Sequence, residues 1–356
     1  MNSTSRSPGR RHAGAAAITA ALVFGGGCQI GGGTRPEPPG GANDANAILV
    51  TPTAFGELNA TQGDVYNASG IVPVGDSQFL IVDNNTNHAL IALTLGADGK
   101  QAAPLAQRPL VGLADDAVDD VEDIALAEEN GRRYVFGTPS LSVKAGSKKK
   151  GKEQKVRPAA LLRVAIGEDG SLTTDAMPGF RDWFVQHVPL LANNADNDPD
   201  FGGLNVEGLA WDPVRHALLF GIRTPVVGHE PVVVPVKVRD LAGPWTEDNL
   251  EVLAPIQIHF ERSTGDQGVR GMTRGPAGNG FLLTVANATS NDVAPFSLYA
   301  WNGGDDGRAR RLPVTFADKM KPEGLTVGTV GGRPAIVFVD DAGGFQVLWL
   351  DSVSGL

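Results

Sequence analysis

Three glutamates and one arginine of this 356-residue chain occupy the same position in a repeated sequence pattern. Each precedes a glycine in a short apolar run, except that Glu122 precedes an aspartate. Five such runs align, and the residues at the shared position are Ser69, Glu122, Glu207, Arg270 and Glu323. If the runs surround a common axis, these side chains converge on one small opening. Carboxylates there could hold a hard cation, and guanidinium groups could stabilise negative charge.

Three carboxylates at one opening repel each other unless something neutralises them, and three arrangements would do so. A Ca²⁺-like ion could be held by Glu122, Glu207 and Glu323. Arg223 and Arg270 could instead bridge the carboxylates. Alternatively, the carboxylates could accept hydrogen bonds from neighbouring backbone N–H groups and lock the repeats together. The residues alone leave these alternatives open.

The repeat itself predicts the architecture. In the third unit, an apolar run at residues 206–211 is followed by the turn sequence Asp-Pro-Val-Arg and a second β-type run at residues 216–222. The shared positions lie 53, 85, 63 and 53 residues apart. Four-stranded units at roughly this period are typical of a β-propeller. We therefore expect an all-β propeller of five or six blades, and we favour six because the 85-residue interval could contain a degenerate blade.

The two ends of the chain and one insertion complete this expectation. Only about thirty residues follow the fifth shared position, enough for three strands, so residues 47–55 are expected to supply the outer strand and close the ring. One short helical insertion is expected near residues 178–191, capping one face. The basic segment at residues 144–157 is expected to be a solvated loop, and His187 and His216 to be structural or surface residues.

The N-terminus predicts export. Arg10 and Arg11 precede an apolar stretch at residues 13–24, and Gly25-Gly26-Gly27 leads to Cys28. We expect a signal peptide at residues 1–27, a lipidated Cys28 with a flexible linker at residues 28–46, and the propeller at residues 47–356. The protein would then be a lipoprotein of the cell envelope, on the periplasmic or outer-membrane side. The alternative is a plain secretory signal and a secreted protein. The single cysteine excludes an intrachain disulfide.

The charge balance narrows the partners. The chain has 40 acidic and 30 basic residues, and removal of the signal segment leaves a formal charge of −13. This disfavours nucleic acid, and it limits membrane contact to the lipid anchor. A small-molecule or envelope-protein ligand is expected, bound by a monomer. The sequence contains no metalloprotease, serine-hydrolase or phosphate-loop motif.

Two longer segments carry a family resemblance. NVEGLAWDP with LLFGIRTP, and VEDIAL with YVFGTPSLSVKAGSKKK, resemble the bacterial domain of unknown function family 3616 over roughly residues 60–356. That family is distantly similar to esterase-like and phytase-like propellers, in which acidic residues at the channel mouth hold metal. The resemblance implies Glu122, Glu207 and Glu323 as Ca²⁺ ligands and Arg223 as an anion contact. Arg270 departs from it by replacing a carboxylate in one blade. The family implies no settled activity.

Two functions follow as hypotheses. The favoured one is a non-catalytic envelope module that binds a ligand or a protein, because propellers serve widely as binding platforms. The alternative is a metal-dependent esterase, phosphoesterase or lactonase. In that case the ion would activate water, and Arg223 and Arg270 would be catalytic residues that stabilise the developing charge.

Overall fold

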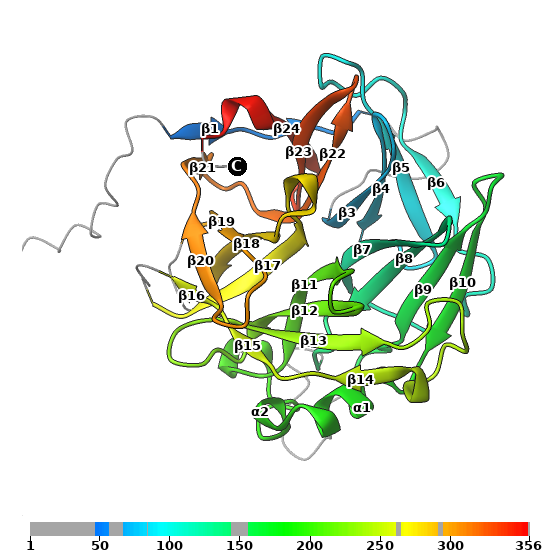
Figure 1. The fold of residues 1–356 in the computed structure, drawn as a ribbon, viewed down its shortest axis with the longest axis vertical. Coiled ribbons are helices and arrows are strands. Elements are labelled where there is room, and N and C mark those ends of the chain that lie inside the picture. The colour runs from blue at the N-terminus through cyan, green and yellow to red at the C-terminus, as the bar shows by residue number, and fades with distance from the viewer. Residues whose placement is uncertain are drawn as a thin grey trace, which may run out of the picture. The chain divides into compact units, whose positions relative to one another are not determined.

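The computed structural model describes residues 47–56, 67–83, 85–143, 156–260, 265–290 and 295–354. All of them belong to one compact unit, Asp44–Leu356. The predicted signal peptide, Cys28, the linker up to residue 46 and residues 144–155 of the basic segment lie outside the described residues. Five sheets of four or five strands surround a central axis, so the fold is a five-bladed β-propeller (Figure 1).

The four main strands of each blade pair antiparallel, and the first of them lies innermost. Blade 1 contains β3 (Ala68–Gly75), β4 (Gln78–Asp83), β5 (Ala89–Thr94) and β6 (Ala106–Pro109). Blade 2 contains β7 (Val121–Glu129), β8 (Arg132–Pro139), β9 (Leu161–Ile166) and β10 (Leu172–Met177). Blade 3 contains β11 (Asn205–Asp212), β12 (Ala217–Thr224), β13 (Val232–Val238), β14 (Leu250–Val252) and β15 (Ile256–Gln257).

The remaining two blades follow the same plan. Blade 4 contains β17 (Gln267–Arg274), β18 (Phe281–Asn287), β19 (Ser297–Trp301), β20 (Arg308–Arg311) and the short β16 (His259–Phe260). Blade 5 contains β22 (Pro322–Val330), β23 (Arg333–Asp340), β24 (Gly344–Trp349) and the short β2 (Thr53–Ala54). The inner strands contact one another in the cyclic order β3, β7, β11, β17 and β22, and β22 returns to β3.

The inner strands are near-continuous apolar runs because both of their faces are covered by neighbouring blades. All eight residues of β11 are buried. Between blades 2 and 3, the Phe136 ring lies 6.3 Å from Trp211 and 5.3 Å from Trp245. Burying one such aromatic side chain stabilises the fold by roughly 1.5–3 kcal/mol. With a single cysteine in the chain, this packing between blades is what holds the ring together.

The predicted closure by the N-terminal strand is confirmed. β2 pairs antiparallel with β24 and supplies the fourth strand of blade 5, and the Phe55 ring stacks on Phe345 at 5.5 Å. A separate strand, β1 (Ile48–Val50), pairs in parallel with β21 (Val314–Phe316) between blades 4 and 5. The first described segment thus covers the edge of the last blade, so that no long edge strand is left open there.

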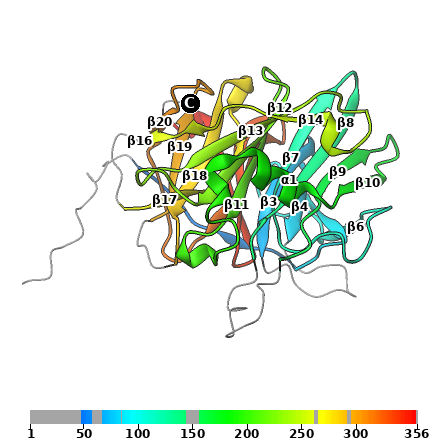
Figure 2. The same ribbon diagram turned by 90° about the horizontal axis from the view of Figure 1, so that it is seen from below.

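The propeller has five blades, so the favoured count of six was wrong. The interval between Glu122 and Glu207 contains the rest of blade 2 and the helical insertion instead of a sixth sheet. The insertion forms α1 (Phe180–His187) and α2 (Pro189–Ala192) at the perimeter of the ring (Figures 1 and 2). Phe180 and Phe184 pack on Phe220 at 5.3 and 5.2 Å, so the predicted helical insertion is present, but it lies at the perimeter and not on one face of the ring. In the part of the chain described, no helix is long and apolar enough to cross a membrane.

Candidate functional site

A β-bulge interrupts every inner strand at the same place. In each blade the register between the first and second strands skips one residue of the inner strand, which leaves that residue without a partner across the sheet. The skipped residues are Ser69, Glu122, Glu207, Arg270 and Glu323, and we call this set the bulge ring. Bulges re-aim side chains, and they occur frequently beside functional sites. The shared sequence position therefore corresponds to one local backbone geometry.

Arg270 lies between two carboxylates of the bulge ring. Its Nε is 2.5 Å from Glu207 Oε2, and its Nη2 donates a hydrogen bond to Glu323 Oε1. The guanidinium also stacks on Phe296, with Cζ 5.4 Å from the ring centre. Blade 4 thus contributes the cation that joins blades 3 and 5, and its two carboxylate partners raise the pKa of Arg270 against the effect of burial.

Glu207 is held by two further donors. Its Oε1 accepts hydrogen bonds from Arg223 Nη1 at 2.6 Å and from Asn205 Nδ2 at 2.9 Å. Arg223 is itself skipped in the register of β12, and its Nε donates to the Ala288 carbonyl at 2.8 Å. Of the three arrangements considered for the glutamates, an Arg–Glu network is therefore the one that describes Glu207 and Glu323.

Glu122 differs from the other two glutamates. It is half-buried, and among the described residues it has neither a hydrogen-bond donor nor an ion-pair partner. Desolvation by burial raises its pKa well above the usual value, and the nearby carboxylates of Asp120, Glu207 and Glu323 raise it further, against the opposing effect of Arg270. The raised pKa extends the pH range over which Glu122 is a neutral carboxyl group, and that form can both donate and accept a hydrogen bond.

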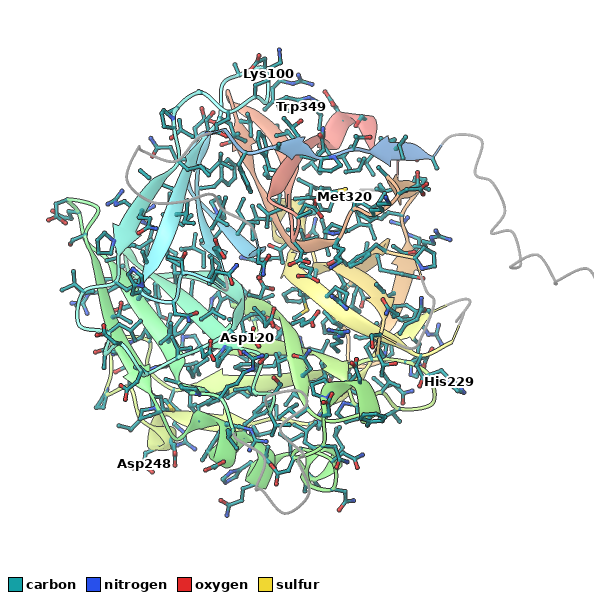
Figure 3. The ribbon with its side chains drawn as sticks, turned by 180° about the vertical axis from the view of Figure 1, so that it is seen from behind. Lys100, Asp120, His229, Asp248, Met320 and Trp349 are labelled. Carbon is teal, nitrogen blue, oxygen red and sulfur yellow. The ribbon has the colours of Figure 1, made fainter. Side chains whose placement is uncertain are left out.

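Two neighbouring acids share this electrostatic environment. Burial raises the pKa of Glu323 to about 7; Arg270 opposes this rise, while Glu207 and Asp341 add to it. Asp120 lies near the centre of the ring (Figure 3), and burial raises its pKa as well. It accepts a hydrogen bond from Ser140 Oγ at 2.8 Å, and Arg157 Nε lies 3.3 Å from its Oδ2.

A shared calcium ion does not fit this arrangement. Arg270 already occupies the position between Glu207 and Glu323, and Arg223 takes a further oxygen of Glu207. Among the described residues, no group of three or more His, Cys, Asp or Glu side chains could hold a metal. The two arginines balance the carboxylates of Glu207 and Glu323. The proposal of Glu122, Glu207 and Glu323 as metal ligands thus finds no support in this geometry.

Asp123 closes the channel just beyond the bulge ring. The other four blades have glycine at this position, and the Asp123 side chain occupies the axis instead. It accepts backbone N–H groups from Ile124 at 2.8 Å, Leu209 at 2.7 Å and Met272 at 3.3 Å. A Cβ added to Gly70 would lie 2.6 Å from Asp123 Oδ1, so only glycine fits there. One carboxylate thereby links blades 2, 3 and 4.

Sequence reasoning missed the role of Asp123, although one signal was present. It is the only non-glycine residue at its position in the five repeats. Burial raises the pKa of Asp123, and the three N–H donors oppose that rise. Breaking the hydrogen bonds of a buried carboxylate is costly. The aspartate that stands here in place of glycine therefore has a structural role.

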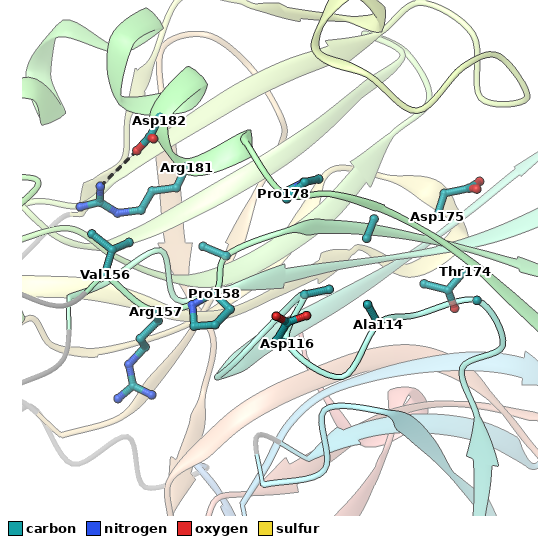
Figure 4. A pocket seen from close by; sticks show the side chains of 14 residues that line it. Ala114, Asp116, Val156, Arg157, Pro158, Thr174, Asp175, Pro178, Arg181 and Asp182 are labelled. Atoms are coloured by element: carbon teal, nitrogen blue, oxygen red, sulfur yellow. Dashed lines mark ion pairs between the residues drawn. The ribbon is translucent and has the colours of Figure 1, made fainter.

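A groove of about 650 Å³ lies beside blade 2 (Figure 4). Asp116, Arg157, Thr174 and Arg181 are among the residues that line it. Arg157 connects the groove to the bulge ring, because the same side chain approaches Asp120. The groove beside blade 2 therefore provides open space near the charged side chains of Arg157 and Asp120.

No family model and no curated protein matches this chain. Its resemblance to the domain of unknown function family 3616 therefore stays a prediction. Among solved structures, an endo-arabinase from Bacteroides thetaiotaomicron is 14% identical, with 84% of this chain and 98% of that chain covered and a TM-score of 0.44. An α-L-arabinofuranosidase from Lactobacillus brevis is 11% identical, with 82% and 92% covered and a TM-score of 0.46. A glucose dehydrogenase is 12% identical, with 80% and 97% covered and a TM-score of 0.37. No activity of this chain follows from these likenesses.

Proposed function

We propose that this protein is a non-catalytic ligand-binding propeller of the cell envelope, with its binding site at the bulge ring. One observation carries the proposal. Glu122 is a half-buried carboxyl group without a described partner, whereas Glu207, Arg270 and Glu323 of the bulge ring are paired. Polar groups that are partly shielded from water usually have a hydrogen-bond partner, and Glu122 has none among the described residues. A ligand that bonds to Glu122 supplies that partner.

The charges favour a neutral or cationic ligand. Arg223 and Arg270 already bind carboxylates, so an anion would have to displace Glu207 or Glu323. A protonated Glu122 can bond a hydroxyl, an amide or an ammonium group. The ligand would be a small polar molecule or a polar segment of an envelope protein.

The binding proposal is tested at Glu122. We would screen neutral and cationic small molecules, and a solubilised envelope extract, for retention by the purified full-length protein. Glu122→Gln keeps a neutral hydrogen-bonding group and should retain the ligand at pH 7, whereas Glu122→Leu should lose it about tenfold or more. Glu128→Gln, on the exposed side of β7, is the matched control. Undiminished retention by Glu122→Leu would refute the site.

We further propose that the protein is exported and lipid-anchored through Cys28. The positive residues, apolar stretch and small residues before this cysteine support it. Full-length protein expressed in a bacterial host should sediment with membranes and incorporate labelled fatty acid. Cys28→Ser should lose the label and move to the soluble exported fraction. An unlabelled wild type recovered from the cytoplasm would contradict both steps.

A second candidate function is hydrolysis of a phosphoester or lactone-like ester. It is favoured by two carboxyl groups with raised pKa values in one ring, since such groups serve as general acids and bases. The assay is turnover of generic phosphoesters and lactones with and without a chelator. Turnover that disappears in Glu122→Gln and in Glu323→Gln would place this function first, and its absence under both conditions would remove it.

A further inference from the structure

We propose a second binding site at the end of the channel opposite the bulge ring, which takes a small apolar molecule carrying one anionic group. A cavity of about 300 Å³ opens there, and all five inner strands line it. Its walls come from the later halves of these strands, whereas the bulges lie in the earlier halves. It is therefore separate from the site proposed above.

The repeat register defines this end of the channel. The residues four positions after the bulge ring are Pro73, Leu126, Trp211, Arg274 and Val327, and we call this set the apolar end. All five line the cavity. Four of them are apolar, and three of those, Pro73, Leu126 and Val327, remain half-exposed. A concave surface lined by apolar groups and a few polar ones is typical of a small-molecule site.

Arg274 supplies the charge that selects the ligand. It is exposed, and no carboxylate among the described residues pairs with it. Its described hydrogen bond is a long one of 3.4 Å, from Nη2 to the Gly278 carbonyl. Arg270, four residues earlier in the same strand, binds two carboxylates. The Arg274 guanidinium, at the rim of a cavity whose exposed lining is about equally polar and apolar, is complementary to a carboxylate attached to an apolar body.

Asp123 and an unusual turn bound the cavity. Asp123 lies along β7 between Glu122 of the bulge ring and Ile124 of the cavity wall, and its carboxylate accepts hydrogen bonds from backbone N–H groups of β11 and β17. The volume corresponds to on the order of ten non-hydrogen atoms, which suits a single aromatic ring with a short acid chain. At the rim, Ala277 adopts a left-handed conformation with φ of 51°. Non-glycine residues held in this region cluster at ligand-binding positions.

The test uses a charged probe and its uncharged isostere. Binding of 3-phenylpropionate to the purified full-length protein is measured by titration calorimetry beside 3-phenylpropionamide and acetate. We expect the carboxylate with the ring to bind, the amide to bind about tenfold or more weakly, and acetate, which lacks the apolar body, to bind weakest of all. Equal affinities for the acid and the amide, or no binding of the acid at millimolar concentration, would overturn the proposal.

Variants assign the binding to this cavity. Arg274→Gln should lower the affinity for the acid about tenfold or more and leave the amide unchanged. Arg311→Gln, an exposed arginine on β20, is the matched control and should change neither. Val327→Trp should fill the cavity and abolish both. Melting temperatures verify that each variant is folded. Wild-type affinity in Arg274→Gln, or in a folded Val327→Trp, would refute the site.

Discussion

The two ends of the central channel are built from the same five strands, but they differ in whether their arginines are paired with carboxylates. At the bulge ring, Arg270 and Arg223 are bonded to buried carboxylates, and the charges nearly cancel. At the apolar end, Arg274 stands alone beside hydrophobic side chains. The contrast within β17 is the most direct, because Arg270 and Arg274 are four residues apart. An arginine therefore holds blades together at the bulge ring, whereas an arginine at the apolar end is available to a ligand.

The bulges explain why the two ends differ. A bulge turns one side chain per blade out of the alternating pattern and toward its neighbours, so polar residues meet there. Beyond the bulge the strands pair regularly in four blades, and in blade 1 the register shifts once more between Pro73 and Gly75. The side chains there pack by size and hydrophobicity. If the contacts that hold the blades together are concentrated at the bulge ring, substitutions there should destabilise the protein more than substitutions at the apolar end.

Replacing Arg270 by methionine should have the largest effect. The variant leaves Glu207 and Glu323 buried without their shared cation, which costs about 3–5 kcal/mol of unfolding free energy. Arg274→Met, in the same strand, should change stability by less than about 0.5 kcal/mol because the side chain is exposed. Urea unfolding of both variants measures the difference. Similar losses of unfolding free energy in the two variants would contradict the proposed difference between the two ends.

The substitution Glu207→Gln should cause the second-largest loss of stability. The amide cannot neutralise Arg223 and Arg270 together, and we expect a loss of roughly 3 kcal/mol. Glu251→Gln, an exposed carboxylate on β14, is the control for the same chemical change. If the ring instead held a metal, this variant would lose ion binding with little loss of stability, so calorimetric titration with Ca²⁺ accompanies the unfolding measurement.

Asp123→Ala tests the partition between the two ends. Three backbone N–H groups lose their acceptor, so the free energy of unfolding should fall by about 2 kcal/mol. Amide hydrogen exchange should increase at Leu209 and Met272, which belong to other blades. Unchanged exchange at both amides would mean that this carboxylate does not link the blades.

The smallest effect concerns pH and Glu122. Its pKa is raised in the folded state, so its contribution to stability is full below the unfolded value near 4.5 and is lost as pH rises through the folded value. Glu122→Gln cannot ionise. It should match the wild type at pH 4 and be the more stable of the two at pH 8, with a difference that grows as pH rises. Glu128→Gln should show no such trend. If the wild type instead became more stable than Glu122→Gln as pH rises, the pKa of Glu122 would be lowered in the folded state and not raised.

Much of the architecture was predictable from the sequence. The spacing of the repeats predicted a propeller, and the short final repeat predicted closure by an N-terminal strand, which β2 confirms. The helical insertion was also expected, and Phe180 and Phe184 anchor it. The favoured sixth blade failed because length does not distinguish a blade from an insertion. The 85-residue interval holds α1 and α2, which pack on the existing blades.

The sequence by itself determined which residues meet, because a repeat places equivalent residues at equivalent points around an axis. It did not determine how they meet. Only the tertiary structure decided that Arg270 reaches both neighbouring carboxylates, that Glu122 reaches none of the described donors, and that Asp123 spans three blades. The physical reason is that these outcomes depend on distances of a few ångströms between strands 50 to 150 residues apart, and such distances are set by packing of the whole ring.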